Sequence, residues 1–435
     1  MPGWTELPRS EDPRRLAVIG AGYVGLTTAA GLTAVGHHVV VGEADEHRLA
    51  ELRAGRVPFR EPGLPDLMAD AISAGRLEFT GDNAAAASGV DAVFLAVPTP
   101  EGRGGGADLS ALEQAIDSIA PVVASPTAVV VKSSVPPGAA RRLAAHLLQA
   151  GSDAPLVLSP EFLQESRAVE GILHPHRVVV GSDDRQARRL VASLHAPFGA
   201  PVIETDPESA ALTKYASNAY LATRLTFVNA IAHLAESVGA DVGAVLEGLA
   251  LDPRIGPHYL RPGPGYGGSC FPKDLRALVA AADAYGHDLK LIKAVVETND
   301  DQLDRVVAKT GETVGGLAGR VVALLGLAFK GGTEDTRGSP AVALARRLVE
   351  AGATVRAYDP AAQVELDGVV PAPDPLTAAS GADAVLVATE WPEFADIDPR
   401  RLAAVMRGSV VVDARNLLDR DAVLAAGLVY RGLGR

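Results

Sequence analysis

Short apolar segments alternate with helical segments along the first 200 residues of the chain. The apolar runs, which are typical of buried strands, cover 16–19, 38–41, 92–97, 128–132, 156–158 and 178–180. An alanine-rich helix follows the first run and is predicted to end near Val35, just before a glycine. Alternating strands and helices predict a parallel sheet that is covered by helices on both faces.

The same alternation returns in the last third of the chain. Strands are predicted at 321–325, 355–358, 384–388 and 410–412, with a helix over 339–352. Between the two halves, apolar residues recur at helical spacing from about 207 to 238 without a strong breaker. This spacing predicts one long helix, of a kind that connects domains or packs across a dimer interface. We therefore expect an α/β fold in which two α/β domains flank a helical middle.

Composition narrows the class of protein. The 435 residues are 48% hydrophobic and 21% charged, which fits a globular protein of two to three domains. A net charge of −13 disfavours nucleic-acid and membrane-surface partners, and no run of about 20 apolar residues predicts a membrane span. Residues 1–15, rich in proline and charge, are predicted to be a disordered tail without a signal peptide.

Cysteine usage points to a reducing compartment. Cys270 is the single cysteine, which excludes an intrachain disulfide and a cysteine-rich zinc site. A cytoplasmic location is therefore expected. Composition alone leaves open whether this thiol is a small core residue or a reagent.

A glycine-rich turn lies between the first strand and the first helix. Gly20, Gly22 and Gly25 match G-x-G-x-x-G, in which the glycines allow a tight turn, a close approach to a pyrophosphate and close helix–strand packing. Glu43 ends the next strand, where an acid binds the adenosine ribose and repels a 2′-phosphate. The alternative is a glycine-rich turn in a domain that binds no nucleotide. The position of the turn between a strand and a helix favours nucleotide binding, and Glu43 favours NAD over NADP.

A second glycine-rich segment, 265–269, leads directly into Cys270. Glycines before a cysteine let a ligand approach the sulfur, and a nearby lysine or helix N-terminus favours the thiolate. A buried, inert cysteine is the alternative. The glycine-rich approach and the neighbouring pair Lys273 and Asp274 favour a nucleophile.

Two pairs of polar residues are candidates for supporting roles. Lys214 and Asn218 lie four positions apart on one face of the long helix and could stabilise an oxyanion, although spacing alone favours a solvated face. Glu161 and Glu165 follow a strand at the carboxyl edge of the sheet, where either could be a general base. An acid-rich first helical turn explains that second pair equally well.

Taken together and in this order, the motifs resemble the UDP-glucose 6-dehydrogenase family over nearly the whole chain, from about Leu16 to about Asn416. Segments 214–218 and 265–274 resemble the glucose branch of the nucleotide-sugar 6-dehydrogenases rather than the N-acetylmannosamine branch. Further matching segments are 60–64, 97–100, 132–136, 326–330, 335–337 and 389–391.

The resemblance implies a specific domain organisation. Two Rossmann-like, doubly wound parallel-sheet domains are joined by a long central helix, and the chain forms a homodimer or higher homo-oligomer. The expected boundaries are an NAD-binding domain over 16–206, a helical dimerisation domain over 207–312 and a nucleotide-sugar-binding domain over 313–435. No metal is implied.

The resemblance also implies a reaction, the four-electron oxidation of a sugar C6 alcohol to a carboxylate with two NAD molecules. Cys270 adds to the intermediate aldehyde, and the resulting thiohemiacetal is oxidised to a thioester that water hydrolyses. The implied supporting groups are Lys214 and Asn218 for the oxyanions, Glu161 for the base, Asp274 for proton transfer and Ser134 for holding the catalytic water.

Binding residues carry over in the same way. Those implied around NAD are Gly20, Gly22, Tyr23, Val24, Gly25, Glu43, Arg48, Thr99, Ser133, Glu165, Lys273 and Arg337. Those implied around the nucleotide-diphosphate sugar are Glu161, Phe162, Leu163, Glu165, Lys214, Asn218, Arg254, Tyr259, Arg261, Gly265, Tyr266, Gly267, Phe329, Lys330 and Arg415. Arg254 matches an arginine that reaches into the neighbouring subunit's site.

Several positions depart from the family pattern. Glu43 replaces an aspartate, Ser134 a threonine, Ser166 and Ala414 each a glycine, and residues 331–332 are Gly-Gly in place of a proline-containing pair. The changes beside Lys330 and Arg415 could loosen the pocket, so dTDP-glucose is an alternative to UDP-glucose. GDP-mannose and a UDP-aminosugar are less favoured. A non-catalytic binding protein is disfavoured because every catalytic group is retained.

Overall fold

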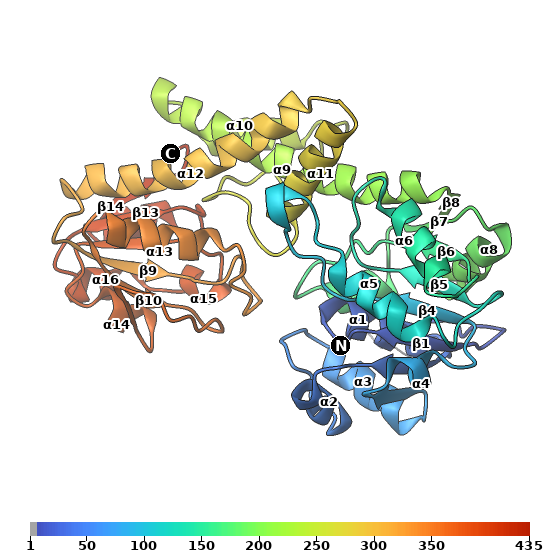
Figure 1. Ribbon diagram of the computed structural model, residues 1–435. Helices are drawn as coiled ribbons and strands as arrows, with labels where there is room; N and C mark the ends of the chain where they lie inside the picture. Colours follow the sequence, from blue (N-terminus) through green and yellow to red (C-terminus); the bar gives the residue numbers. More distant parts are fainter. Residues whose placement is uncertain (1–6) are drawn as a thin grey trace. The chain divides into compact units, whose positions relative to one another are not determined.

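The computed structural model describes residues 7–435, which divide into two compact units (Figure 1). The first comprises Met1–Ser217 with Arg276–His287, and the second comprises Asn218–Leu275 with Asp288–Arg435. The chain passes from the first to the second within the helix α9 (Pro207–Val238), which has 32 residues and the bounds predicted from its spacing. The domain boundaries expected from the sequence stay a prediction.

The first unit is built on an eight-stranded sheet in the order β3-β2-β1-β4-β5-β6-β7-β8. Its strands are β1 (Arg15–Ile19), β2 (His38–Gly42), β3 (Leu77–Thr80), β4 (Ala92–Leu95), β5 (Ala128–Val131), β6 (Leu156–Leu158), β7 (Val178–Gly181) and β8 (Val202–Thr205). Its helices are α1 (Tyr23–Ala34), α2 (Glu46–Arg53), α3 (Leu64–Ser73), α4 (Asn83–Ala87), α5 (Ser110–Ile119), α6 (Ala139–Gln149), α7 (Ala168–Leu173) and α8 (Arg185–Leu194).

Both faces of this sheet are buried, because successive residues of a strand point to opposite sides. Leu16 and Val18 of β1 belong to one apolar core, together with residues of α1, α3 and α8. Ala17 and Ile19 belong to a second core, together with residues of α5 and α6. The continuous apolar runs of the sequence are therefore strands covered by helices on both faces, as predicted.

One strand pair departs from the predicted parallel arrangement. β6 and β7 pair antiparallel, through Leu158 and Gly181. The connection between them carries only the six-residue helix α7, which packs against α1, where Ile172 lies close to Gly31. The chain therefore does not cross back over the sheet, and residues 159–167 remain at the carboxyl end of β6.

The second unit contains a six-stranded parallel sheet in the order β11-β10-β9-β12-β13-β14. Its strands are β9 (Val321–Leu325), β10 (Thr354–Tyr358), β11 (Val369–Pro371), β12 (Ala384–Val387), β13 (Val410–Asp413) and β14 (Val429–Gly432). The helices after α9 are α10 (Val242–Ala250), α11 (Phe271–Ala284), α12 (Lys290–Val314), α13 (Pro340–Glu350), α14 (Pro375–Ala379), α15 (Pro392–Ala395), α16 (Pro399–Val405) and α17 (Arg420–Ala425). The structure thus confirms the α/β fold with two doubly wound sheets and a long central helix.

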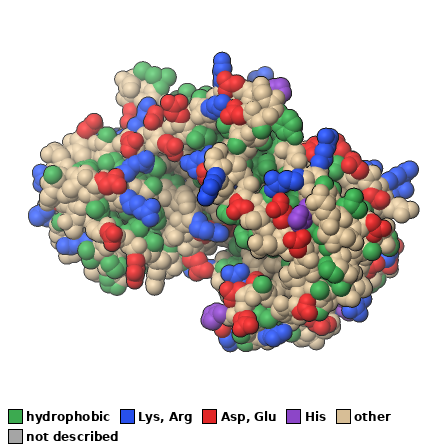
Figure 2. Space-filling view, viewed as in Figure 1, with side chains coloured by type: hydrophobic (Ala, Val, Ile, Leu, Met, Phe, Trp, Pro, Cys, Tyr) green, Lys and Arg blue, Asp and Glu red, His purple; other side chains and the backbone are tan. Residues whose placement is uncertain are grey.

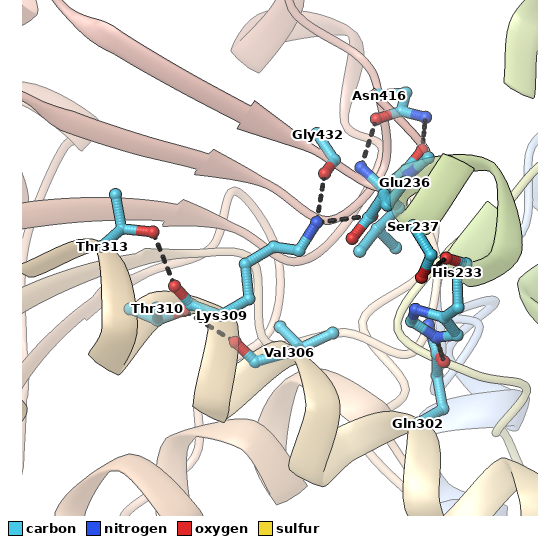
Figure 3. Close-up of polar contacts among 12 residues, drawn as sticks. His233, Glu236, Ser237, Gln302, Val306, Lys309, Thr310, Thr313, Asn416 and Gly432 are labelled. Carbon is cyan, nitrogen blue, oxygen red and sulfur yellow. Dashed lines mark hydrogen bonds and ion pairs between the residues drawn. The ribbon is translucent and has the colours of Figure 1, made fainter. Parts of the chain in front are cut away.

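Polar contacts fasten the last strand of the second unit to its helices (Figure 3). Lys309 of α12 donates to Glu236 of α9 at 2.5 Å and to the carbonyl of Gly432 at 2.7 Å. Glu236 also accepts the backbone N–H of Gly434 at 2.6 Å. Because one lysine and one glutamate join two helices and the end of β14, they fix the carboxyl edge of this sheet against the helical layer.

The predicted disordered tail, 1–15, lies partly outside the described residues. From Leu7 onward the chain is held against the first unit: Leu7 packs on its apolar core, and the N–H of Ser10 donates to the carbonyl of Val35. Arg15 already belongs to β1. The stretch was polar enough to suggest a tail, but these contacts order its second half.

The surface is mixed in character. Basic and acidic side chains are interspersed over the face in Figure 2, with hydrophobic side chains in small groups between them. Among the described residues, no helix is both long enough and apolar enough to cross a membrane.

Candidate active site

The glycine-rich turn of the first unit is shaped to receive a phosphate group. Gly20 has φ +99°, and a Cβ on Gly25 would lie 1.8 Å from the carbonyl oxygen of Gly20, so both positions require glycine. A Cβ on Gly22 would meet no atom within 4 Å. Gly22 caps α1 without a side-chain hydrogen bond, which leaves the first N–H groups of that helix facing open space. Such a helix end binds a pyrophosphate, so these residues fit NAD.

Glu43 stands directly after β2 and closes one side of this turn. Its carboxylate accepts the N–H of Ala21 at 3.0 Å and the N–H of Asp45 at 2.9 Å, with Arg48 at 3.5 Å. The side chain is buried, so its position is fixed by the turn that it supports. The extra methylene of glutamate, compared with aspartate, lets the carboxylate reach Ala21.

Tyr23 connects the turn to a segment more than 140 residues later. Its hydroxyl donates to the buried carboxylate of Glu61 and accepts the N–H of Ser166 at 2.8 Å. Glu61 also accepts the N–H groups of Ala168 and Val169, at the start of α7. Burial, together with the Glu61 carboxylate, raises the pKa of Tyr23, so this hydroxyl stays protonated and remains a donor.

Ser166 occupies the left-handed backbone region, with φ +63°, where the family pattern has glycine. A non-glycine residue there costs about 1–2 kcal/mol, partly offset by the chain entropy that glycine adds to the unfolded state. Ser166→Gly is therefore expected to raise the free energy of unfolding by about 1 kcal/mol. Urea titration measures this difference, with Ser166→Ala as the matched control that keeps the Cβ. A glycine variant no more stable than the alanine variant would contradict the account.

Glu161 and Lys214 form a buried ion pair within the first unit. Lys214 Nζ lies 2.8 Å from Glu161 Oε1, and both side chains are more than nine-tenths buried. The other carboxylate oxygen accepts the N–H of Leu163 at 2.5 Å. Burial opposes ionisation of Glu161, but the ammonium groups of Lys214 and Lys132 and this N–H together lower its pKa. Glu161 is therefore an ionised carboxylate that is held in place by a cation.

Several other predicted side chains of the first unit lie in segments that follow strands of its sheet. Thr99, Ser133 and Ser134 are buried in the segments after β4 and β5, and Ser133 donates to the carbonyl of Val97 at 2.6 Å. Phe162 follows Glu161, and Lys214 Nζ lies 5.5 Å from the centre of its ring. Each follows a parallel strand, at the sheet edge where ligands bind in such folds.

Cys270 immediately precedes α11 in the second unit, is half-buried and forms no disulfide. The positive end of a 14-residue helix stabilises a thiolate at that position. Asp274, in the first turn, is almost fully buried and accepts from Asn218 at 2.7 Å and from Lys273 at 2.7 Å. The nucleophile candidate, a carboxylate, an amide and an ammonium are thus brought together, which spacing alone did not establish.

The glycine-rich loop before Cys270 packs closely against the sheet of the second unit. The N–H of Gly268 donates to the carbonyl of Gly338 at 3.2 Å, and a Cβ on Gly268 would lie 2.9 Å from the ring of Phe329. Arg415 donates to the carbonyl of Phe329 at 3.3 Å and pairs with Glu390 at 3.0 Å. These residues follow β9, β12 and β13, so they gather at one carboxyl edge.

Glycine at 331 allows a close approach of two backbone segments. A Cβ there would lie 2.5 Å from the carbonyl oxygen of Glu390, so the Gly-Gly pair after Lys330 packs tightly against residue 390. Tyr259 has φ +57°, a strained conformation of the kind that clusters at binding sites.

Two predicted residues are engaged locally in the second unit. Arg254 pairs with Asp252 and has an 87% exposed side chain, and Arg337 pairs with Asp335 and is 70% exposed. Arg337 adjoins Gly338, whose carbonyl accepts the N–H of Gly268 in the loop before Cys270, whereas Arg254 hydrogen-bonds to Asp252. Gly265, Tyr266 and Gly267 lie in that loop, where Asn299 accepts the N–H of Tyr266 at 2.7 Å.

Three buried or half-buried groups beside Glu161 were not predicted as functional. Lys132 directly follows β5, Arg177 stacks 3.6 Å from the centre of the Phe162 ring, and His195 lies at the end of α8. Lys132 belonged to a matching segment and could have been noticed for its place after an apolar strand. Nothing in the sequence distinguishes His195 from a surface histidine.

Three family models match the chain in series. They describe the NAD binding domain (residues 14–199), the central domain (208–301) and the UDP binding domain (323–420) of the UDP-glucose/GDP-mannose dehydrogenase family.

Named relatives match over almost the full length. The chain is 41% identical to a UDP-glucose 6-dehydrogenase of Rhizobium meliloti, covering 97% of this chain and 99% of that protein. It is 39% identical to the UDP-glucose 6-dehydrogenase TuaD of Bacillus subtilis, covering 97% and 93%. A solved UDP-glucose dehydrogenase from Pyrobaculum islandicum superposes with a TM-score of 0.92 at 36% identity, covering 98% and 99%.

Proposed function

Because this chain belongs to the UDP-glucose/GDP-mannose dehydrogenase family and carries its NAD-binding domain, we propose that it oxidises UDP-glucose to UDP-glucuronate with two NAD per turnover. The observation that carries the proposal is Cys270 at the start of α11, with Asn218, Lys273 and Asp274 gathered around the first turn of that helix. A dehydrogenase that stopped at the aldehyde has no use for a nucleophile in this position.

Bound NAD supplies the hydride acceptor for both oxidations. The Cys270 thiolate adds to the carbonyl carbon of the aldehyde formed first, and the tetrahedral alkoxide that results can release its existing C–H hydrogen as hydride while the C=O bond re-forms. The second oxidation leaves a thioester on Cys270. Water adds to the thioester carbon, the C–S bond breaks, and the thiolate leaves.

Charges on the chain support these steps. Asn218 and Lys214 can stabilise the oxyanions that develop when carbonyl carbons are attacked, and such donors contribute about 3–4 kcal/mol to a transition state. Glu161, ionised and held by Lys214, takes the proton of the attacking water. Asp274, with its two donors, exchanges protons with the groups around the thiol. Ser134 keeps the hydroxyl that holds this water.

Positively charged side chains of the second unit bind the diphosphate. Arg415 and Lys330 lie beside Phe329 at the carboxyl edge of the second sheet, and Arg261 precedes the glycine-rich loop. Phosphate oxygens bind arginine well because its fork gives two parallel hydrogen bonds. These side chains bind the diphosphate and do not distinguish uracil from thymine. Selection of the nucleobase therefore depends on other residues of the pocket.

A comparison of nucleotide sugars tests which of them is the substrate. UDP-glucose is expected to give the highest kcat/KM among UDP-glucose, dTDP-glucose, GDP-mannose and UDP-N-acetylmannosamine. A higher kcat/KM for dTDP-glucose would move the assignment to that donor while leaving the chemistry in place.

We further infer a homodimer through α9. Tyr220, Phe227 and Leu234 recur every seven residues and are each more than half exposed, and Val238 one turn later is 68% exposed. A heptad stripe of large apolar side chains is typical of a helix that packs on another helix. Phe227→Glu is expected to yield monomers in analytical ultracentrifugation, whereas Glu247→Gln on α10 leaves the dimer intact.

Glu43 sets the choice of cofactor. Its carboxylate repels a 2′-phosphate, and the isosteric amide keeps an acceptor for Ala21 but removes the charge. Glu43→Gln is expected to lower the ratio of kcat/KM for NAD over NADP by at least about 10-fold, since one lost charge interaction is worth about 1.4 kcal/mol or more. The control is Glu46→Gln, an exposed acid at the start of α2. An unchanged ratio would contradict this role.

A further inference from the structure

A cavity of about 170 Å³ leads into the first unit and reaches Glu161. Its rim is exposed and includes Gln164, His174 and His176. Its inner wall is buried and includes Lys132, Glu161 and His195, which are 4%, 8% and 2% exposed. Because a water molecule occupies roughly 30 Å³ of liquid, the cavity has room for several.

His195 shows which kind of ligand the inner wall requires. Its Nδ1 lies 2.9 Å from the carbonyl oxygen of Val191, which can only accept, so Nδ1 carries the proton. Nε2 is then an acceptor, and it has no hydrogen-bond partner among the described residues. Burial, followed by the charge of Lys132, lowers the pKa of His195 to about 3, so the ring stays neutral. This buried nitrogen of a cavity-lining residue therefore lacks a hydrogen-bond donor, which a water molecule in the cavity can provide.

Charge is unbalanced at the same place. The amino groups of Lys132 and Lys214 are both buried near the buried carboxylate of Glu161, so a protonated Lys132 adds a second positive charge there. Lys214 takes one carboxylate oxygen and the N–H of Leu163 takes the other. Lys132 Nζ donates to the Ser159 hydroxyl at 3.4 Å, a long hydrogen bond to an uncharged group. Arg177 adds a further positive charge on the cavity wall and interacts with Glu161.

We propose that this cavity holds ordered water and that, during thioester hydrolysis, Lys132 receives through this water the proton that Glu161 takes from the attacking water. The proposal rests on the proposed function, because it assigns the fate of a proton in that reaction. Lys132 does not touch the substrate and acts through Glu161.

The step balances as follows. One O–H bond of the attacking water breaks as its oxygen bonds to the thioester carbon, and its proton passes to the Glu161 carboxylate. The proton then moves along the cavity water to the neutral amine of Lys132, which returns Glu161 to its ionised state. Lys132 releases the proton to the solvent at the exposed rim, and no oxidant or reductant takes part.

The surroundings of Lys132 suit this exchange. Burial, opposed by the carboxylate of Glu161 and reinforced by the charge of Lys214, lowers the pKa of Lys132 to about 8. Neutral His195 is the titratable group that faces it from α8. A lysine at its ordinary pKa near 10.4 would almost never be a neutral amine at pH 7–8. With its pKa lowered to about 8, a substantial fraction of Lys132 is neutral in this pH range.

Rapid-quench and stopped-flow measurements on Lys132→Met test the proposal, with Lys290→Met, on the exposed start of α12, as the matched control. The variant is expected to form two NADH per site in a first turnover as the wild type does. Hydrolysis of its acyl-enzyme is expected to be about 100-fold slower, the usual contribution of a proton-transfer group. In the wild type, the hydrolysis rate is expected to rise as the pH passes through about 8, because Lys132 then becomes neutral. This rise is expected to be absent from Lys132→Met.

Two further variants separate proton transfer from charge or structure. Lys132→Arg keeps a cation that does not release its proton, and it is expected to hydrolyse as slowly as Lys132→Met. Lys132→Ala opens space beside the cavity, and methylamine is expected to restore hydrolysis at least 10-fold, whereas tetramethylammonium, which has no proton to exchange, does not.

Full activity of Lys132→Arg, equal rescue by methylamine and tetramethylammonium, or a pH 8 inflection that persists without Lys132 would each overturn the proposal. If Lys132→Met fails to fold, Lys132→Arg decides by itself. A wild-type protein that forms no acyl-enzyme from UDP-glucose and NAD contradicts the proposed function instead, so the two failures are distinguishable.

Discussion

Cys270→Ser is expected to abolish the formation of UDP-glucuronate, with kcat lowered by at least about 10³-fold. A serine hydroxyl at the start of α11 remains protonated and adds poorly to an aldehyde, so the second oxidation has no covalent adduct from which to start. Binding of UDP-glucose is expected to change by less than a few-fold, because the loop 263–268 and Arg415 are left intact. Product analysis and calorimetric titration measure the two quantities.

The single cysteine of the chain makes a second form of this test clean. Alkylation with iodoacetamide is expected to inactivate the protein at one label per chain, and UDP-glucose is expected to slow the labelling. Ser269→Ala, next to the thiol, is the matched control and should keep most of the activity. Substantial acid formation by Cys270→Ser, or by the fully alkylated protein, would contradict a covalent mechanism.

Lys214→Met is expected to lower both activity and stability. Removal of the ammonium takes a stabilising charge from the oxyanion, for a loss of about 10²–10³-fold in kcat. It also leaves the Glu161 carboxylate buried without its nearest cation, for a loss of about 3 kcal/mol in the free energy of unfolding. Steady-state kinetics and urea titration at pH 7 measure these effects.

The double variant Lys214→Met/Glu161→Leu separates the two losses. Replacing both charges with apolar groups is expected to recover much of the stability and none of the activity. The pH dependence has a defined sign: the lowered pKa of Glu161 means that the ionised pair stabilises the fold above the ordinary glutamate pKa, and this contribution disappears as the pH falls through the folded value. A stability difference between wild type and Lys214→Met that grew in acid would therefore contradict the ion pair.

The sequence predicted the central strands of both sheets and missed the strands at their edges. β1, β4, β5, β9, β12 and β13 are apolar runs because both of their faces are buried. β3, β8, β11 and β14 are the four edge strands, and residues such as Glu78, Glu204 and Arg431 interrupt them. An edge strand faces solvent along one side, so its composition does not stand out from that of a loop.

The candidate site shows a similar division. Motifs located the glycine turn, Glu43, Glu161, Lys214 and Cys270, because each lies within or directly after a segment with a recognisable local pattern. The partners within the site depended on long-range folding: Asp274 meets Asn218 across 56 residues, and Tyr23 meets Ser166 across 143. His195 lies on the cavity wall only because α8 ends there, and no local pattern indicates it.

The stoichiometry of complete oxidation distinguishes a four-electron reaction from one that stops at the aldehyde. A limiting amount of UDP-glucose is converted with excess NAD, and NADH and sugar products are measured together. A covalent mechanism through Cys270 predicts two NADH and one UDP-glucuronate for each UDP-glucose, with no free aldehyde. One NADH per UDP-glucose, with aldehyde accumulating in solution, would contradict it.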